Sequence, residues 1–330
     1  MEKVIRSDNF GKRIYLYIFF IFNIVFAFYY TELRFQLNLQ FEHATLELLM
    51  NGKAHLPFQY RMLIPKLAAF LYNFSPVKNK IPNIINLFFI IEFLAVFSVV
   101  FIFRYYLSLF LKNKKLNYIL VFLIYPVLVF TYLIPRSDPI FYPYDTFSIL
   151  FFTAALIFLY KKQFIPYYLI FITATFNRET TCFVTIIFLF TYCKKISNLK
   201  LSSHLFLQFI LWLSVKLLLR KIYINNSGDG VFENHFFNNI KYLSDFEHYP
   251  SLFSALAYIW IPVLVKWREI PDDFLKKAIL VIIFFIPGMI LVGNIYEIRI
   301  YGELIPVFLT PFILLLINFV KKQKIKEMTF

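Results

Sequence analysis

Cysteine, glycine and acidic residues are all scarce in this chain. Its 330 residues include two Cys, seven Gly and 19 Asp or Glu, and only 16% are charged, against about 25% in a typical soluble domain. So few glycines argue against close helix packing through small residues as a general theme. Cys182 and Cys193 flank one apolar segment and lie about one membrane span apart, so we expect no disulfide between them.

Motifs for nucleotides, metals and internal repeats are also lacking. The sequence contains no Gly-rich phosphate-binding loop, no repeated unit and no His or Cys spacing typical of a metal site. The five His are scattered, and His43 beside Glu42 is more typical of a surface pair than of a catalytic one. We therefore expect no cofactor, and nothing indicates a divalent metal.

Apolar residues dominate what remains. Hydrophobic residues make up 60% of the chain, with 45 Phe and 23 Tyr. This composition predicts an all-α, polytopic transmembrane bundle that forms one integral membrane domain over 1–330. Since a crossing helix needs about 20 apolar residues, we predict about ten spans. They are 14–31, 84–106, 117–134, 144–160, 164–176, 180–193, 203–219, 252–267, 275–293 and 302–320.

The net charge of +15 has a topological explanation. In a soluble protein it would suggest a nucleic-acid partner, but here the basic residues form short runs at the termini and between spans. Such runs mark the cytoplasmic side of a membrane. With ten crossings every run falls on that side, so we predict two cytoplasmic termini, a bacterial inner-membrane location and no nucleic acid.

Two long loops are then extracytoplasmic, at 32–83 and 220–251. The first alternates polar and apolar residues from about 37 to 49, which predicts an amphipathic helix. Residues 61–74 are moderately apolar, and we interpret them as a surface or partly inserted helix. Treating them as a crossing would reverse the side of every later basic run.

Four small polar clusters border very apolar segments, at 60–65, 142–145, 177–180 and 297–303. The predicted topology places all four on the extracytoplasmic side. A charge at membrane depth costs about 2.5–3.5 kcal/mol on insertion scales, so such residues usually serve a function. Their gathering on one face predicts a polar cavity.

The segment 164–193 is the most informative of these regions. Basic runs bracket both its ends, yet about 30 residues are too few for two full spans. We therefore predict two short, broken spans whose turn lies below the outer surface. Irregular backbone at that depth needs protein or a water-filled cavity around it, which makes Arg178 and Glu179 cavity residues. The alternative is an ion pair that only fixes the turn.

The candidate site residues fall into two chemical groups. The guanidinium fork suits phosphate oxygens, so positive charge at this face predicts phosphate binding. The phosphate-binding candidates are Arg61, Arg178, Arg299 and Lys216. Asp145, with Asp138 nearby, could act as general base for a hydroxyl acceptor. Alternatively, Asp145 caps a helix, and Arg61 anchors the chain at the lipid interface.

The layout resembles the multi-spanning glycosyltransferases of the GT-C type. The similar features are a first span leading into a long external loop with Glu32, Glu42 and Glu47, short broken spans midway, and a Glu/Arg motif before a late span. The resemblance implies transfer of a sugar from a polyprenyl-phosphate donor to a surface glycan or lipid-linked acceptor at the extracytoplasmic face. It also implies a catalytic acidic residue, the base of the reaction, in the first external loop, where this chain has no Asp and no adjacent acidic pair.

Several alternatives stay open at this point. The catalytic carboxylate is one of Glu42, Glu47, Asp145 and Glu179. An O-antigen or capsule repeat-unit polymerase has a similar composition and one sizeable outer loop, here 220–251. A flippase or transporter for lipid-linked glycan is a third reading, since charge within a membrane also marks transport pathways.

Overall fold

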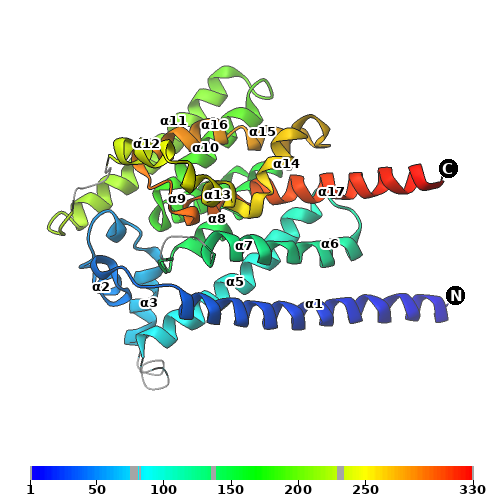
Figure 1. Cartoon of the computed structure of the whole chain (residues 1–330), viewed down its shortest axis with the longest axis horizontal. Coiled ribbons are helices and arrows are strands. Elements are labelled where there is room, and N and C mark those ends of the chain that lie inside the picture. The colour runs from blue at the N-terminus through cyan, green and yellow to red at the C-terminus, as the bar shows by residue number, and fades with distance from the viewer. Residues whose placement is uncertain (1, 75–80, 82, 135–138, 229–233, 329–330) are drawn as a thin grey trace.

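The computed structural model describes residues 2–74, 81, 83–134, 139–228 and 234–328, and over these ranges the fold is helical (Figure 1). The described ranges contain no strand beyond one bridge between Leu39 and Ile140. The α-helices are α1 (Glu2–Leu37), α2 (Leu46–Asn51), α3 (Leu63–Asn73), α5 (Ile84–Ser108), α6 (Lys114–Leu120), α7 (Ile124–Tyr132), α8 (Asp145–Tyr160), α9 (Phe164–Asn177), α10 (Cys182–Tyr192), α11 (Asn198–Ile222), α12 (Phe236–Ser244), α13 (Tyr249–Phe253), α14 (Trp260–Val265), α15 (Asp273–Ile279), α16 (Ile282–Val292) and α17 (Ile305–Met328).

Among the described residues, five helical segments are long and apolar enough to cross a membrane. They are Ile14–Leu37, Ile84–Ser108, Lys114–Tyr132, Asp273–Val292 and Ile298–Gln323. The outward face of the first carries large apolar side chains, such as Tyr17 at 65% exposure and Ile21 at 61%. An exterior this apolar indicates a membrane-embedded protein.

The other five predicted spans do not form long apolar helices. Those at 144–160, 164–176 and 180–193 correspond to α8, α9 and α10, which are apolar but only 16, 14 and 11 residues long. The predicted span at 203–219 lies inside the continuous helix α11. Polar side chains interrupt the apolar sequence of this helix, and it is not among the five candidate spans. The prediction at 252–267 is divided between α13 and α14 by a turn with positive φ angles.

The predicted amphipathic helix at 37–49 is not one continuous helix. Helix α1 already extends to Leu37, and the chain then makes a 3₁₀ turn at Glu42–Ala44 before α2 begins. Thr45 caps α2 by accepting a hydrogen bond from the Leu48 amide, and Gly52 at φ 75° ends it. These local caps favour a short helix over a long one.

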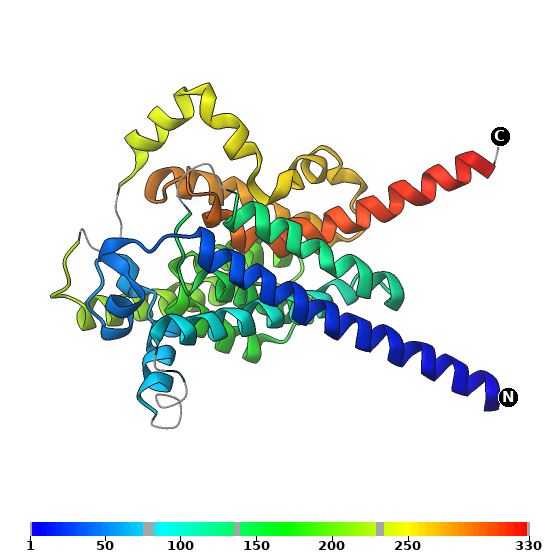
Figure 2. The same cartoon turned by 60° about the horizontal axis from the view of Figure 1, so that its bottom comes forward.

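Helix α8 is the centre of the bundle. It packs against α5 on one side and α9 on the other, and its N-terminal end meets the 3₁₀ helix Ile298–Leu304. Both chain termini lie at one end of the molecule, whereas α2 and α3 lie at the opposite end (Figures 1 and 2). The N-terminus of α8 is where the polar clusters of the sequence meet.

Candidate functional site

Asp145, the first residue of α8, is fully buried and contacts three guanidinium groups. Arg34 comes from α1, Arg178 from the turn after α9, and Arg299 from the 3₁₀ helix before α17. Their nearest nitrogens lie 3.4, 3.3 and 3.4 Å from the Asp145 carboxylate oxygens. One carboxylate therefore joins three segments that are far apart in the sequence.

Further pairs extend this network inward. Arg34 pairs with Glu92 of α5 and donates to the Thr146 hydroxyl at 2.6 Å. Arg178 Nε lies 3.4 Å from Glu303, which also accepts a hydrogen bond from Thr180. Buried charges with this many partners hold the helices in one arrangement.

Arg61 and Glu179 form the other half of the site. The Arg61 Nε lies 3.1 and 3.2 Å from the two Glu179 oxygens, and Arg61 Nη1 donates to the Tyr144 hydroxyl at 3.0 Å. Lys216 of α11 adds a second cation, 3.6 Å from Glu179.

The cations and carboxylates of this network, which are buried or partly buried, balance in formal charge. The cations are Arg34, Arg61, Arg178, Lys216 and Arg299, and the carboxylates are Glu92, Asp145, Glu179, Glu297 and Glu303. Pairing offsets the cost of removing each ion from water. An anionic ligand would therefore have to compete with a carboxylate already present for its cation.

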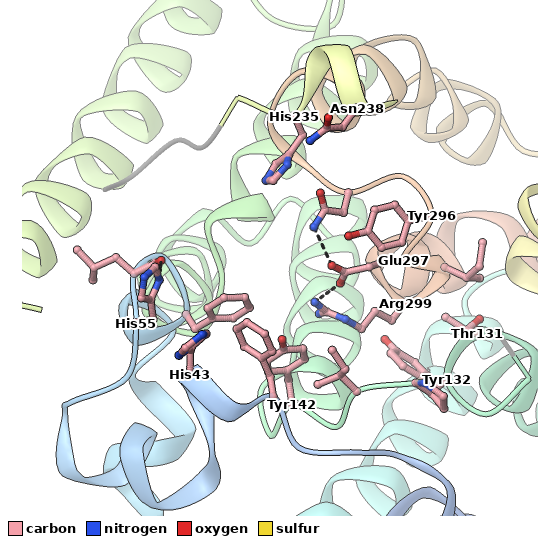
Figure 3. Close-up of a pocket in the computed structure, with 17 residues that line it drawn as sticks. His43, His55, Thr131, Tyr132, Tyr142, His235, Asn238, Tyr296, Glu297 and Arg299 are labelled. Carbon is pink, nitrogen blue, oxygen red and sulfur yellow. Dashed lines mark hydrogen bonds and ion pairs between the residues drawn. The ribbon is translucent and has the colours of Figure 1, made fainter. Parts of the chain in front are cut away.

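A cavity of about 420 Å³ opens beside this network (Figure 3). Figure 3 shows Glu297 and Arg299 near its centre, His43 and His55 on one side, and His235 above. A second cavity of about 110 Å³ adjoins it and is lined by Arg61, Arg178 and Glu179. The two cavities share Phe58, His235, Asn294, Glu297 and Arg299.

Glu297 is the carboxylate that both cavities share. One of its oxygens pairs with Arg299 Nη2, and the other accepts a hydrogen bond from the Asn294 side chain at 3.0 Å. Burial alone would raise the pKa of Glu297, but Arg299 and Asn294 outweigh burial and hold this pKa below its ordinary value. Glu297 is therefore an ionised group at the cavity wall.

The sequence-predicted site residues do not all lie together. Arg61, Arg178, Glu179 and Arg299 line the cavities. Asp145 lies behind the cavity lining, as does Lys216, which pairs with the cavity residue Glu179.

The two candidates in the 32–83 loop, which the sequence predicts to be extracytoplasmic, lie apart from this group. Glu42 is 81% exposed and pairs with His43 at 3.2 Å, so the predicted surface pair is present. Glu47 is exposed and borders a separate surface hollow. Neither lines the cavities of the buried network. Asp138 lies outside the described residues.

Sequence reasoning missed Arg34, Glu92 and Asn239 as members of the site, and it assigned no role of its own to Glu297. Glu92 stands alone inside a predicted span and Arg34 just after one, and charge in such places is a signal of function or pairing. The sequence indicated Glu297 only as one member of the polar cluster at 297–303. Asn239, within the predicted loop 220–251, gave no signal, because its role depends on a contact about 50 residues away.

Asn239 of α12 fixes the segment that carries Glu297 and Arg299. Its side-chain amide donates to the carbonyls of Ile290 at 2.9 Å and Gly293 at 2.6 Å, at the C-terminal end of α16. Its oxygen accepts from the Ile295 amide at 3.2 Å. The side chain is fully buried, so it acts as a cap between the two segments.

Replacing Asn239 by Ala should loosen this segment. The change leaves buried backbone groups without partners, at about 1–3 kcal/mol for each lost buried contact. We expect a lower melting temperature in detergent and faster hydrogen exchange at residues 293–297. Asn238→Ala, at the next position, is the matched control for melting, and equal effects of the two changes would contradict the capping role.

The fold and the site define a helical, membrane-embedded protein with a polar cavity built on a buried ion network. Comparison with protein-family models, with curated proteins and with solved structures finds no match for this chain.

Proposed function

We propose that this protein is a membrane glycosyltransferase that takes a sugar from a polyprenyl-phosphate donor and transfers it to a surface glycan or lipid-linked acceptor. The observation that carries the proposal is the joined cavity, in which Arg61, Arg178 and Arg299 accompany a partly exposed carboxylate, Glu297. Guanidinium groups suit a phosphate, and a carboxylate suits the proton of an acceptor hydroxyl.

The chemistry follows from these two kinds of group. Bond breaking at the sugar leaves negative charge on the phosphate, and arginines already held in position stabilise that charge without rearranging. Asp145 supplies the positioning, because it contacts Arg34, Arg178 and Arg299 from the buried side. A cation preorganised in this way favours the transition state over the ground state.

The proposal that the substrate carries a lipid chain is supported by an apolar groove. It has a volume of about 300 Å³ and lies between α12–α14 on one side and α16–α17 on the other. Its lining is Leu243, Leu252, Phe253, Ala255, Leu256, Trp260, Ile282, Ile286, Ile290, Ile295, Tyr301, Leu304 and Phe308. Ile295 and Tyr301 flank Glu297 and Arg299 in the chain, so one segment borders both the groove and the polar cavity.

The larger cavity also has surfaces that suit a sugar. Phe58 and Tyr142 stack at 5.3 Å between ring centroids with an 8° interplanar angle, and both line the cavity. Asn238, Asn294 and His43 lie around the same space. A few polar groups set among aromatic walls are typical of small-molecule sites.

The proposed topology has ten crossings in the bacterial inner membrane, with both termini in the cytoplasm. The basic runs support it, as does the position of the two termini at one end of the molecule (Figures 1 and 2). The cavity then faces the extracytoplasmic side, where lipid-linked sugars and not nucleotide sugars are the available donors.

Arg299→Gln tests the proposal directly. The change removes a cation from the leaving phosphate, and we expect sugar transfer to fall by about 10²–10³-fold. The measurement is transfer of labelled sugar from a panel of polyprenyl-phosphate sugars by the purified protein in liposomes. Arg268→Gln, at an exposed arginine outside the site, is the matched control.

The products separate the alternatives. One added sugar fits the transferase, and a ladder of repeats identifies a polymerase. Movement of lipid-linked glycan across the liposome membrane without transfer would identify a flippase and reject the proposal. Full transfer by Arg299→Gln would reject the assigned role of the cavity.

A further inference from the structure

We propose that the phosphate of the bound substrate displaces Glu297 from Arg299, and that the released Glu297 carboxylate then accepts the proton of the acceptor hydroxyl. The inference rests on the proposed function and names the base of that reaction. Arg299 is the cation that we assign to the phosphate, yet it is already paired with Glu297, a carboxylate of the same cavity.

Arg299 is arranged to exchange one partner while keeping the other. Its Nη1 lies 3.4 Å from the fully buried Asp145, and its Nη2 pairs with the partly exposed Glu297. The guanidinium also lies over the Tyr142 ring, 4.2 Å from the centroid. A phosphate entering from the cavity can take Nη2 while Asp145 and Tyr142 hold the guanidinium in place.

Glu297 is also arranged to be released without losing its orientation. Asn294 donates to Oε1 at 3.0 Å, whereas Arg299 pairs with Oε2. When phosphate takes Arg299, the Asn294 contact keeps the carboxylate at the wall and Oε2 faces the cavity without its cation. Glu297 is 20% exposed, so an acceptor hydroxyl can reach it.

The other carboxylates of the network lack this combination. Asp145 contacts three guanidinium groups and lines neither of the two joined cavities. Glu179 accepts from Arg61 through both oxygens and has Lys216 as a second cation, so one phosphate would not free it. Glu303 is only 2% exposed. Among the described residues Glu297 has one ion-pair partner, Arg299, so phosphate binding to Arg299 can convert Glu297 into a base.

The step balances in atoms and electrons. The acceptor hydroxyl gives its proton to Glu297 Oε2, and its oxygen forms a bond to the anomeric carbon of the sugar. The bond from that carbon to the phosphate oxygen breaks, and its electron pair stays on the prenyl phosphate held by Arg299. Glu297 returns the proton to water, and its ion pair with Arg299 re-forms when the prenyl phosphate leaves.

The exchange can be measured without any sugar transfer. The probe is methyl farnesyl phosphate, a phosphodiester that keeps one negative charge across the working pH range, titrated into the full chain in detergent. Glu297→Gln removes the competing charge, so we expect the probe to bind about ten-fold more tightly. Arg299→Gln should weaken binding at least ten-fold. Glu297→Asp, which keeps the charge, should not tighten it, and Glu269→Gln is the surface control.

Transfer assays then separate catalysis from support of the fold. With an active donor, Glu297→Gln should lower kcat by about 10²-fold or more while KM falls. If Glu297 only held Arg299 in position, the Glu297→Gln change would raise KM instead. Weaker or unchanged probe binding by Glu297→Gln would overturn the exchange, and an unchanged kcat would overturn the role as base. Absence of transfer by the wild type from every donor would reject the proposed function, and the probe would still decide the exchange.

Discussion

Replacing Asp145 by Asn should prevent the protein from accumulating in its folded form. The change leaves Arg34, Arg178 and Arg299 around a neutral amide in a fully buried position. Breaking one partner of a buried ion pair costs about 3–5 kcal/mol, and the whole stability of a domain is about 5–15 kcal/mol. Three cations lose their shared counter-charge here, so the loss should lie at the upper end.

The measurement is the amount of monodisperse protein recovered from membranes, with its melting temperature in detergent. The matched control is Asp245→Asn, which removes a half-exposed carboxylate outside the network. Asp145→Asn combined with Arg178→Gln restores the charge balance around this position and should recover part of the stability. A single variant that accumulates normally but is inactive would instead support Asp145 as the catalytic base.

The sequence was sufficient to predict that the polar clusters would meet. Basic runs assigned a side to every loop, and the clusters at 60–65, 142–145, 177–180 and 297–303 fell together on one side. The prediction that the turn after residue 176 lies inside the protein is confirmed, because Asn177 is fully buried and Arg178 is 3% exposed. Both conclusions need only span length and charge, which are local properties of the sequence.

Pairing within the network could not be predicted in the same way. Arg34 and Asp145 are separated by 111 residues in the sequence, and Arg299 and Asp145 by 154. The pairing of cations with carboxylates depends on how each helix is rotated about its axis and how deep it lies in the membrane. The boundaries of the spans determine neither the rotation nor the depth. Our proposal of Glu297 as the base rests on that pairing, because Asp145 contacts three cations and Glu297 one among the described residues.

Local backbone geometry limited the fold prediction as well. Leu256, Ala257 and Tyr258 have φ angles of 54°, 54° and 61°, a left-handed turn that costs about 1–2 kcal/mol per residue and that non-glycine residues rarely adopt. An apolar run gives no sign of such a turn, so 252–267 was predicted as one span. The turn forms part of the wall of the apolar groove, which fits the tendency of strain to collect at functional sites.

Gly302→Ala should be the second severely destabilising change, for a steric reason. A Cβ at this position would lie 1.9 Å from the Tyr132 hydroxyl oxygen and 2.8 Å from its Cζ. Tyr132 is 2% exposed, and its ring lies under the Arg34 guanidinium at 4.6 Å. The ring therefore cannot move aside without disturbing the ion network, and overpacking of this kind costs about 1–3 kcal/mol or more.

A second substitution separates this clash from a general intolerance of change. The Tyr132 hydroxyl is buried without a hydrogen-bond partner among the described residues, so Tyr132→Phe alone should change the melting temperature little. In the double variant, Tyr132→Phe removes the atom nearest the new methyl group and should restore part of the stability that Gly302→Ala loses. Because Gly302 lies in the 3₁₀ helix with Arg299, phosphodiester binding should recover together with the melting temperature. Recovery of stability without binding would mean that the helix refolds with Arg299 displaced from the cavity.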